Sequence, residues 1–229
     1  MKIRLIIISV SILFFSCKSN VENDAVAKAL PQIDYAVLGS ILDSIHTEDQ
    51  QYRRKIESIK DSFGWESDEM KNHWKIISAT DSSNLVVVKQ ILDEHGWLGR
   101  DEIGGTANST LFLVIQHADQ TTQEQYLPMI RKAVKDGKAN ARSLAMLEDR
   151  IGLGKGEMQI YGSQIGTDPE SGKMYVLPLS EPETVNERRL AVGLGPIEDY
   201  VAHWDLVWDV EEYKKNLPKY IKQLKSKSR

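Results

Sequence analysis

Apolar residues recur three and four positions apart over most of the chain, which is the spacing of one face of an α-helix. The pattern predicts helices within residues 25–62, 68–77, 82–96, 107–118, 122–137, 144–151 and 182–192, with a short segment at 197–203. Asp81 or Ser82 is expected to cap the third of these helices. Thr122 and Gln125 fit a capping box at the start of the fifth.

The apolar pattern changes after Gly156, where two short runs of strand-forming residues flank a turn sequence. Residues 158–165 and 173–177 enclose the turn sequence Asp168-Pro169-Glu170-Ser171-Gly172, a composition typical of a β-hairpin. The chain is therefore predicted to be mainly α, a helical domain with one small β-hairpin around residues 158–177.

The first residues have the layout of a bacterial export signal, with two basic residues, an apolar run from Leu5 to Phe15, and then Ser16-Cys17. The run is about half of the roughly 20 apolar residues that a spanning helix needs, so we expect cleavage and not a permanent span. Leu13 to Cys17 resembles a lipobox, which implies cleavage before Cys17 and a lipid on its thiol. The alternative is an ordinary secretory signal with an incidental cysteine.

Residues 1–16 are thus predicted to be a lipoprotein signal peptide and residues 17–24 a tether to the membrane, which is the expected partner. Lys18 follows the cysteine where an inner-membrane retention signal has aspartate, which favours the outer membrane within the cell envelope. Cys17 is the only cysteine. The lipidated chain would therefore have no thiol for a disulfide, and its stability must come from a packed core.

Composition divides the rest into an N-terminal helical segment at 25–80, a domain at 81–209 and a basic amphipathic tail at 210–229. Loss of two basic residues with the signal peptide changes the net charge from −4 to −6. Residues 211–229 hold seven basic and two acidic side chains, a net charge of +5, which leaves −11 on the remainder. Because phosphate binding needs a basic surface, nucleic acid is not an expected partner.

The tail has an amphipathic helical pattern, with Tyr213, Leu217, Tyr220 and Leu224 on one face and lysines on the remaining surface. Pro218 is expected to mark a break or a fresh helix start. Two hypotheses follow: the apolar stripe docks on the acidic domain, or the tail lies on an anionic membrane. Docking is preferred, because this spacing is the usual mark of a helix packed on its own core.

Five short motifs occur in one order between residues 81 and 200. They are His95-Gly96-Trp97, Gln116-His117-Ala118-Asp119, Asp149-Arg150, Gln159-Ile160-Tyr161-Gly162-Ser163-Gln164, and Val185-Asn186-Glu187-Arg188-Arg189 leading into Val192-Gly193-Leu194. Together they resemble a family of uncharacterised bacterial proteins known only as a domain of unknown function. The resemblance implies no reaction, substrate or cofactor, but it directs attention to the reactive side chains within the motifs.

His117 is the main candidate for catalysis. A neighbouring carboxylate makes an imidazole more basic and fixes its tautomer, which suits a general base, and Asp119 or Asp149 is predicted to supply it. The alternative is structural. A histidine at a helix C-terminus interacts favourably with the helix dipole, and Asp119 would then only start the next turn.

The other polar residues of the motifs are predicted to bind a ligand. They are Arg150, Gln159, Tyr161, Gln164, Arg188 and Arg189. The last two are adjacent on a helix and point about 100° apart, so at least one is expected to form an ion pair within the protein. The motifs are expected to bring one set of side chains into a single neighbourhood. That set is His117, Asp119, Asp149, Tyr161, Gln164 and Arg188.

Neither a metal nor another cofactor is predicted. His117 and Asp119 offer two ligands where a catalytic zinc usually has three from the protein, and the other histidines show no recognised ligand spacing. The glycine-rich run at 152–156 lacks the spacing and the hydroxyl of a Walker loop. The chain also has no Gly-x-Ser-x-Gly nucleophile elbow.

Two classes of function remain open. The preferred one is a ligand-binding or interaction domain on a lipoprotein, in which the polar set recognises a small molecule or an envelope component, or only locks the hairpin onto the helices. The alternative is an envelope hydrolase in which His117 is the base, Asp119 or Asp149 orients it, and an arginine stabilises negative charge.

Overall fold

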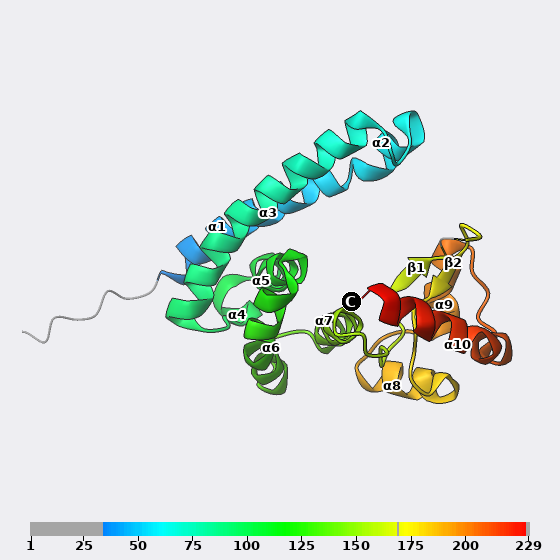
Figure 1. Ribbon diagram of the computed structural model, residues 1–229. Helices are drawn as coiled ribbons and strands as arrows, with labels where there is room; N and C mark the ends of the chain where they lie inside the picture. Colours follow the sequence, from blue (N-terminus) through cyan, green and yellow to red (C-terminus); the bar gives the residue numbers. More distant parts are fainter. Residues whose placement is uncertain (1–33, 169, 228–229) are drawn as a thin grey trace, which may run out of the picture. The chain divides into compact units, whose positions relative to one another are not determined.

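The computed structural model describes residues 34–168 and 170–227 (Figure 1). The predicted signal peptide, Cys17, the tether and the first residues of the N-terminal helical segment lie outside the described residues. None of the helices in the described ranges is long and apolar enough to cross a membrane.

The first part of the described chain is helical throughout. Its helices are α1 (Tyr35–Arg53), α2 (Ile56–Phe63), α3 (Asp68–His95), α4 (Arg100–Ile103), α5 (Gly105–His117), α6 (Gln120–Lys135) and α7 (Ala141–Gly154). Helix α5 contacts α1, α3, α4 and α6. Because these neighbours cover it on several sides, α5 carries apolar residues around most of its circumference, and Ala107, Leu111 and Ile115 are fully buried.

Helix α3 runs without interruption through the position where a new helix was predicted to start. Ser67 caps it, since its hydroxyl accepts a hydrogen bond from the Met70 amide at 3.1 Å. The predicted cap at Asp81 and Ser82 is wrong. The Ser82 hydroxyl instead donates to the Ser78 carbonyl at 2.8 Å, a bond that a serine forms inside a helix.

Helix α6 also starts differently from the prediction. Its N-cap is Asp119, whose carboxylate accepts from the Thr122 amide at 2.8 Å, so the capping box of Thr122 and Gln125 is wrong. That backbone hydrogen bond is the main cause that lowers the pKa of Asp119. Asp119 satisfies an unpaired N–H at the first turn of α6, and this is the structural role that the sequence left open.

The second part of the described chain contains the hairpin and shorter helices. Its elements are β1 (Ile165–Thr167), β2 (Met174–Val176), the 3₁₀ turn η1 (Pro182–Thr184), α8 (Val185–Ala191), α9 (Ile197–Val201), the 3₁₀ turn η2 (Ala202–Trp204) and α10 (Val210–Lys227). The strands are antiparallel, with Ile165 opposite Val176 and Thr167 opposite Met174. The mainly α fold with one small hairpin is confirmed, although residues 158–164 form a loop and not the first strand.

Helix α10 docks on this second part, as preferred from its apolar stripe. Tyr213 is buried, and Leu217 and Tyr220 pack on a small core that includes Val176 and Ile197. The Tyr213 hydroxyl donates to the Leu177 carbonyl at 3.0 Å and accepts from the Leu179 amide at 2.8 Å.

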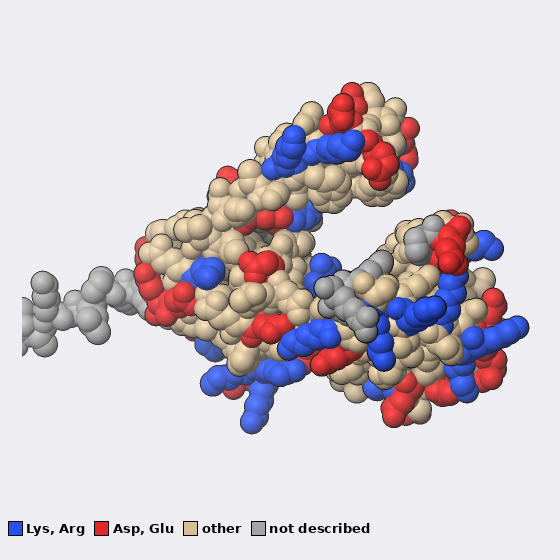
Figure 2. Space-filling model, viewed as in Figure 1, with Lys and Arg blue, Asp and Glu red and all other residues tan. Residues whose placement is uncertain are grey.

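Pro218 lies inside α10, so the predicted break is wrong. The docked face keeps the helix continuous although proline cannot donate a backbone hydrogen bond. Two lysines of α10 pair with acids of the domain, Lys214 with Glu183 at 2.6 Å and Lys219 with Asp168 at 2.7 Å. On the face drawn in Figure 2, basic and acidic side chains are interspersed.

Candidate functional site at His117

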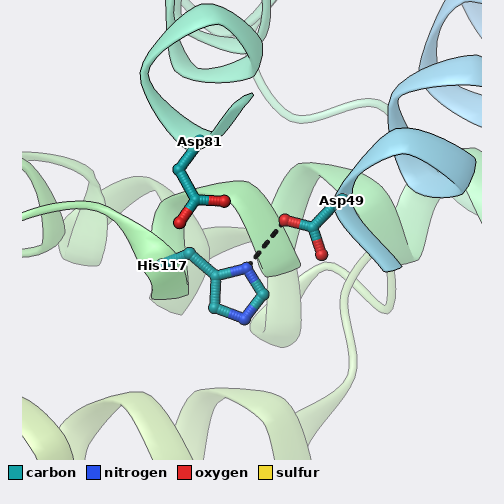
Figure 3. Close-up of side chains that lie close together, drawn as sticks. All are labelled: Asp49, Asp81 and His117. Carbon is teal, nitrogen blue, oxygen red and sulfur yellow. Dashed lines mark hydrogen bonds and ion pairs between the residues drawn. The ribbon is translucent and has the colours of Figure 1, made fainter. Parts of the chain in front are cut away.

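His117, the last residue of α5, forms a hydrogen bond with Asp49 of α1 (Figure 3). Its Nδ1 lies 2.9 Å from Oδ1 of Asp49, a side chain that is 1% exposed. Because an ionised carboxylate only accepts hydrogen bonds, Nδ1 is the donor, and in the neutral ring Nε2 is then the basic nitrogen. Nε2 faces away from Asp49 and makes no hydrogen bond to a described residue.

Arg53 joins Asp49 to a second carboxylate, Asp81 of α3. Its Nη1 donates to Oδ1 of Asp49 at 3.0 Å, and its Nη2 donates to Oδ2 of Asp81 at 2.8 Å. Burial by itself would raise the pKa of Asp49, but the hydrogen bond and charge of His117, with Arg53 and Gln50, hold that pKa below its usual value. Asp49 is therefore an anion that fixes the orientation of the imidazole.

A pocket of about 360 Å³ opens beside these residues. It is lined by Arg53, Trp74, Ile77, Ser78, Asp81, Ser82, Leu85, His117, Ala118 and Asp119. The His117 side chain is 17% exposed, which leaves it accessible from the pocket. Oδ1 of Asp81 is buried and has no hydrogen-bond partner among the described residues, so it remains an available acceptor. We refer to Asp49, Arg53, Asp81 and His117 as the His117 site.

The His117 site also has the composition of a small metal-binding cluster. One ligand atom from each of Asp49, Asp81 and His117 lies within 4.8 Å of the others. However, the Arg53 guanidinium already bonds both carboxylates and supplies the positive charge that they need. A metal ion would have to displace this arginine, so the residues present fit an ion-paired network better than a metal centre.

Asp149 was predicted as a residue that orients His117, but it has a different role. It is 1% exposed, and it accepts hydrogen bonds from the amides of Ile160 at 2.6 Å, Tyr161 at 3.0 Å and Ser163 at 3.0 Å. These donors belong to the loop of residues 157–164, which follows α7. Asp149 is therefore the anchor of this loop, and the carboxylate that orients His117 is Asp49.

Gln159 fixes the same loop from within. Its side chain is fully buried; its amide nitrogen donates to the carbonyls of Gln164 and Leu177 and its oxygen accepts from the Gln164 amide. Gly162 has a φ of +66°, and a Cβ there would lie 2.8 Å from Cδ1 of Ile197. Glycine is therefore required at this turn.

The two adjacent arginines of α8 bind consecutive carbonyls of this loop. Arg188 donates to the Ile160 carbonyl at 2.8 Å, and Arg189 donates to the Tyr161 carbonyl at 2.8 Å. Arg188 also forms the expected ion pair, at 3.6 Å from Glu181. Both guanidinium groups are thus used within the protein. Arg150 differs, because it is exposed and makes no hydrogen bond or ion pair to a described residue.

The sequence matches the family of unknown function DUF6624 over residues 37–211. The chain belongs to this family. The matched range includes Asp49 and Arg53 of α1, which lie before the residues 81–200 on which the resemblance rested. No curated protein and no solved structure matches the chain.

Most of the candidate residues from the five motifs fall into two hydrogen-bonded groups. Asp149, Gln159, Tyr161, Gln164 and the two α8 arginines meet at the loop of residues 157–164. His117 instead meets Asp49, Arg53 and Asp81, and no hydrogen bond or ion pair within the described ranges joins the two groups. In the described ranges, the pocket at His117 is lined by Asp119 but by none of the other residues expected in the same neighbourhood.

Sequence reasoning missed Asp49, Arg53 and Asp81. The first two are four positions apart on one helix, a spacing that signals a local ion pair. Nothing in the spacing connects either of them to His117. They can be found only from the packing of α1 against α3 and α5.

Proposed function

We propose that this DUF6624 protein is a lipid-anchored envelope hydrolase in which His117 is the general base for attack by water. The observation that carries the proposal is the buried Asp49 bonded to Nδ1 of His117, which leaves Nε2 unbonded beside a pocket. A hydrolase of this kind needs a base oriented by a third group, and Asp49 supplies that orientation.

In the proposed reaction, Nε2 of His117 takes a proton from water while the oxygen attacks an electrophilic centre of the substrate. The imidazolium that forms is stabilised by the Asp49 anion and then returns the proton to the leaving group. Arg53 is bonded to Asp49 and Asp81, so its role is to hold Asp49 in place and not to bind substrate.

A non-catalytic ligand-binding domain is the second candidate. It is supported by two polar atoms at the pocket that bond no described residue. In this version, the unpaired Oδ1 of Asp81 and Nε2 of His117 recognise polar groups of a small molecule without turnover.

The two candidates are separated by assaying the protein with four chromogenic or fluorogenic probes: p-nitrophenyl acetate, p-nitrophenyl phosphate, alanine p-nitroanilide and methylumbelliferyl N-acetylglucosaminide. We expect turnover of one class, and His117→Gln is expected to lower kcat/KM by about 10²- to 10⁴-fold. His203→Gln is the matched control, because this exposed histidine bonds only backbone carbonyls. If turnover is unchanged in His117→Gln, His117 is excluded as the general base. A thermal shift with a probe but no turnover would favour the binding domain.

The proposed anchor is the lipid on Cys17, with the outer membrane as the proposed location. It is supported by the basic start, the short apolar run and the lipobox-like residues before the cysteine. Two or more acyl chains would hold the protein on a membrane essentially permanently. Cys17→Ser should therefore move the protein out of the detergent phase, and labelled palmitate that fails to enter the wild-type chain would rule the anchor out.

A further inference from the structure

A second pocket, of about 310 Å³, lies between α10, β2 and the segment before α10. This volume is at the lower end of the range of about 300–1,000 Å³ that small-molecule sites occupy. We call it the aromatic pocket. Its lining includes Lys173, Tyr175, Trp208, Glu212, Asn216 and Tyr220.

The walls of the aromatic pocket are rings in mutual contact. The rings of Tyr175 and Tyr220 stack at 4.2 Å between centroids, and those of Trp208 and Tyr213 lie 4.9 Å apart. Hydrogen bonds fix two of these rings, since Tyr175 donates to Oε1 of Gln223 at 3.1 Å and Tyr213 donates to a backbone carbonyl. The aromatic wall is therefore formed in advance of any ligand, which lowers the entropic cost of binding.

The rim of the aromatic pocket carries both donors and acceptors that the fold does not use. The Glu212 carboxylate and the Lys173 ammonium form no ion pair or side-chain hydrogen bond with a described residue. Asn216 donates its amide nitrogen to the Glu212 carbonyl at 3.0 Å, which leaves its side-chain oxygen as an acceptor. These groups are available to a ligand that both donates and accepts hydrogen bonds.

Some of the charges around the pocket are paired within the protein. Lys219 is 2.7 Å from Asp168 and 3.2 Å from Glu170, so these charges are already paired within the protein. Among the charged lining residues that form no ion pair within the described ranges, Lys173 is basic, whereas Glu212 and Asp209 are acidic. A strongly charged ligand, whether anion or cation, would therefore meet at least one repulsive group in this pocket.

From these observations we propose that the aromatic pocket binds an uncharged sugar ring of a saccharide. A sugar ring has apolar C–H faces that pack on aromatic side chains, and hydroxyls that donate and accept around its edge. The polar wall of α10 lies beyond residue 211, where the match to the DUF6624 family ends. The site does not rest on the proposed hydrolase activity at His117.

The test uses the full chain labelled with 5-fluorotryptophan and observed by ¹⁹F NMR, with the Trp208 resonance assigned from Trp208→Phe. The probes are chitotriose, cellotriose and maltotriose, with tetramethylammonium and inorganic phosphate as charged comparisons. We expect a saturable shift of the Trp208 resonance with at least one saccharide and none with either ion. Asn216→Ala and Glu212→Gln should each weaken saccharide binding about tenfold, which is the loss of one or two hydrogen bonds.

Both substitutions are at surface positions of α10, so the fold should survive, and a circular dichroism spectrum checks this. Asn72→Ala and Glu187→Gln are matched controls on exposed helix positions away from the pocket and should leave saccharide affinity unchanged. The proposal is overturned if no saccharide gives a saturable shift at Trp208, if the shift occurs only with tetramethylammonium or phosphate, or if affinity is unchanged in both pocket variants.

Discussion

Buried carboxylates serve different purposes in two regions of the chain. In the helical part, Asp49 binds the side chains of His117, Arg53 and Gln50. Asp149 of α7 instead binds three backbone amides of the loop that leads into the second part. Both carboxylates are 1% exposed, so burial alone does not distinguish them. They differ in their partners, because Asp49 binds reactive side chains whereas Asp149 binds backbone amides.

The difference follows from the secondary structure. Long helices satisfy their own backbone groups, so polar side chains between α1, α3 and α5 are left to bond one another. The loop of residues 157–164 has no regular backbone partner, and Asp149, Gln159, Arg188 and Arg189 take that role. A dense set of polar residues in a sequence can therefore mark a loop that needs hydrogen bonds as easily as a reactive site.

Removal of α10 by truncation after Asp209 should have the largest effect. It exposes the small C-terminal core, and burial of each large side chain such as Tyr213 or Leu217 is worth about 1.5–3 kcal/mol, so we expect a loss of more than about 4 kcal/mol. Hydrogen exchange should show lost protection near the hairpin while α5 stays protected. Unchanged stability together with lost binding to anionic liposomes would support the membrane hypothesis for the tail instead.

Asp149→Asn should come next in size. An amide cannot accept all three backbone N–H groups, and buried donors are left without a partner, so we expect the free energy of unfolding to fall by about 3–5 kcal/mol in urea. Asp199→Asn is the control, because Asp199 is exposed, and it should change stability by less than about 0.5 kcal/mol. Equal effects of the two substitutions would remove the loop-anchoring role of Asp149.

Asp49→Asn should have a smaller effect on stability than Asp149→Asn but a larger effect on chemistry. Arg53 keeps its bond to Asp81, so we expect a loss of about 2 kcal/mol. Asp49→Asn should also lower the kcat/KM of any reaction that depends on His117. Asp149→Asn, assayed at a temperature at which this variant is folded, should leave kcat/KM nearly unchanged. Asp43→Asn, at an exposed position of the same helix, is the control.

Substitution of Asp168 should have the smallest effect on stability, and that effect should depend on pH. The hydrogen bond from Lys219 is the main cause that lowers the pKa of Asp168 from 3.8 to about 2. A lowered folded-state pKa stabilises the protein above the unfolded value, and that contribution is lost as the pH falls from about 4 towards 2. Asp168→Asn should therefore lower the melting temperature at pH 7 and make little difference near pH 2. If the melting temperatures of the wild type and Asp168→Asn differed by the same amount across this pH range, the ion pair would be contradicted.

Much of the fold was predictable because helices and hairpins are local. The helix at residues 107–118 and the hairpin turn at 168–172 were recognised from spacing and composition. The errors occurred at helix starts, at residues 158–164, which form a loop, and at Pro218, where α10 continues. Asp81 and Ser82 have the chemistry of a cap, but α3 continues through them because Ser67 already caps it and no glycine or proline interrupts the turn.

The candidate site was predicted only in part. His117 was singled out, and its location at the end of a helix was correct. Its predicted partners, Asp119 and Asp149, were not, because each is used for a backbone role: one caps α6 and the other anchors a loop. Residue type and spacing show what a carboxylate can do, but not which of its possible partners lies within reach.

The sequence by itself determined the helical periodicity, the hairpin and the resemblance to an uncharacterised family, because each depends on residues close together along the chain. Only the tertiary structure decided that His117 bonds Asp49, which is 68 positions away, and that Arg53 joins Asp49 to Asp81. The physical reason is that a buried polar group must find a partner wherever packing brings one, and packing of α1 against α3 and α5 is not encoded in local spacing.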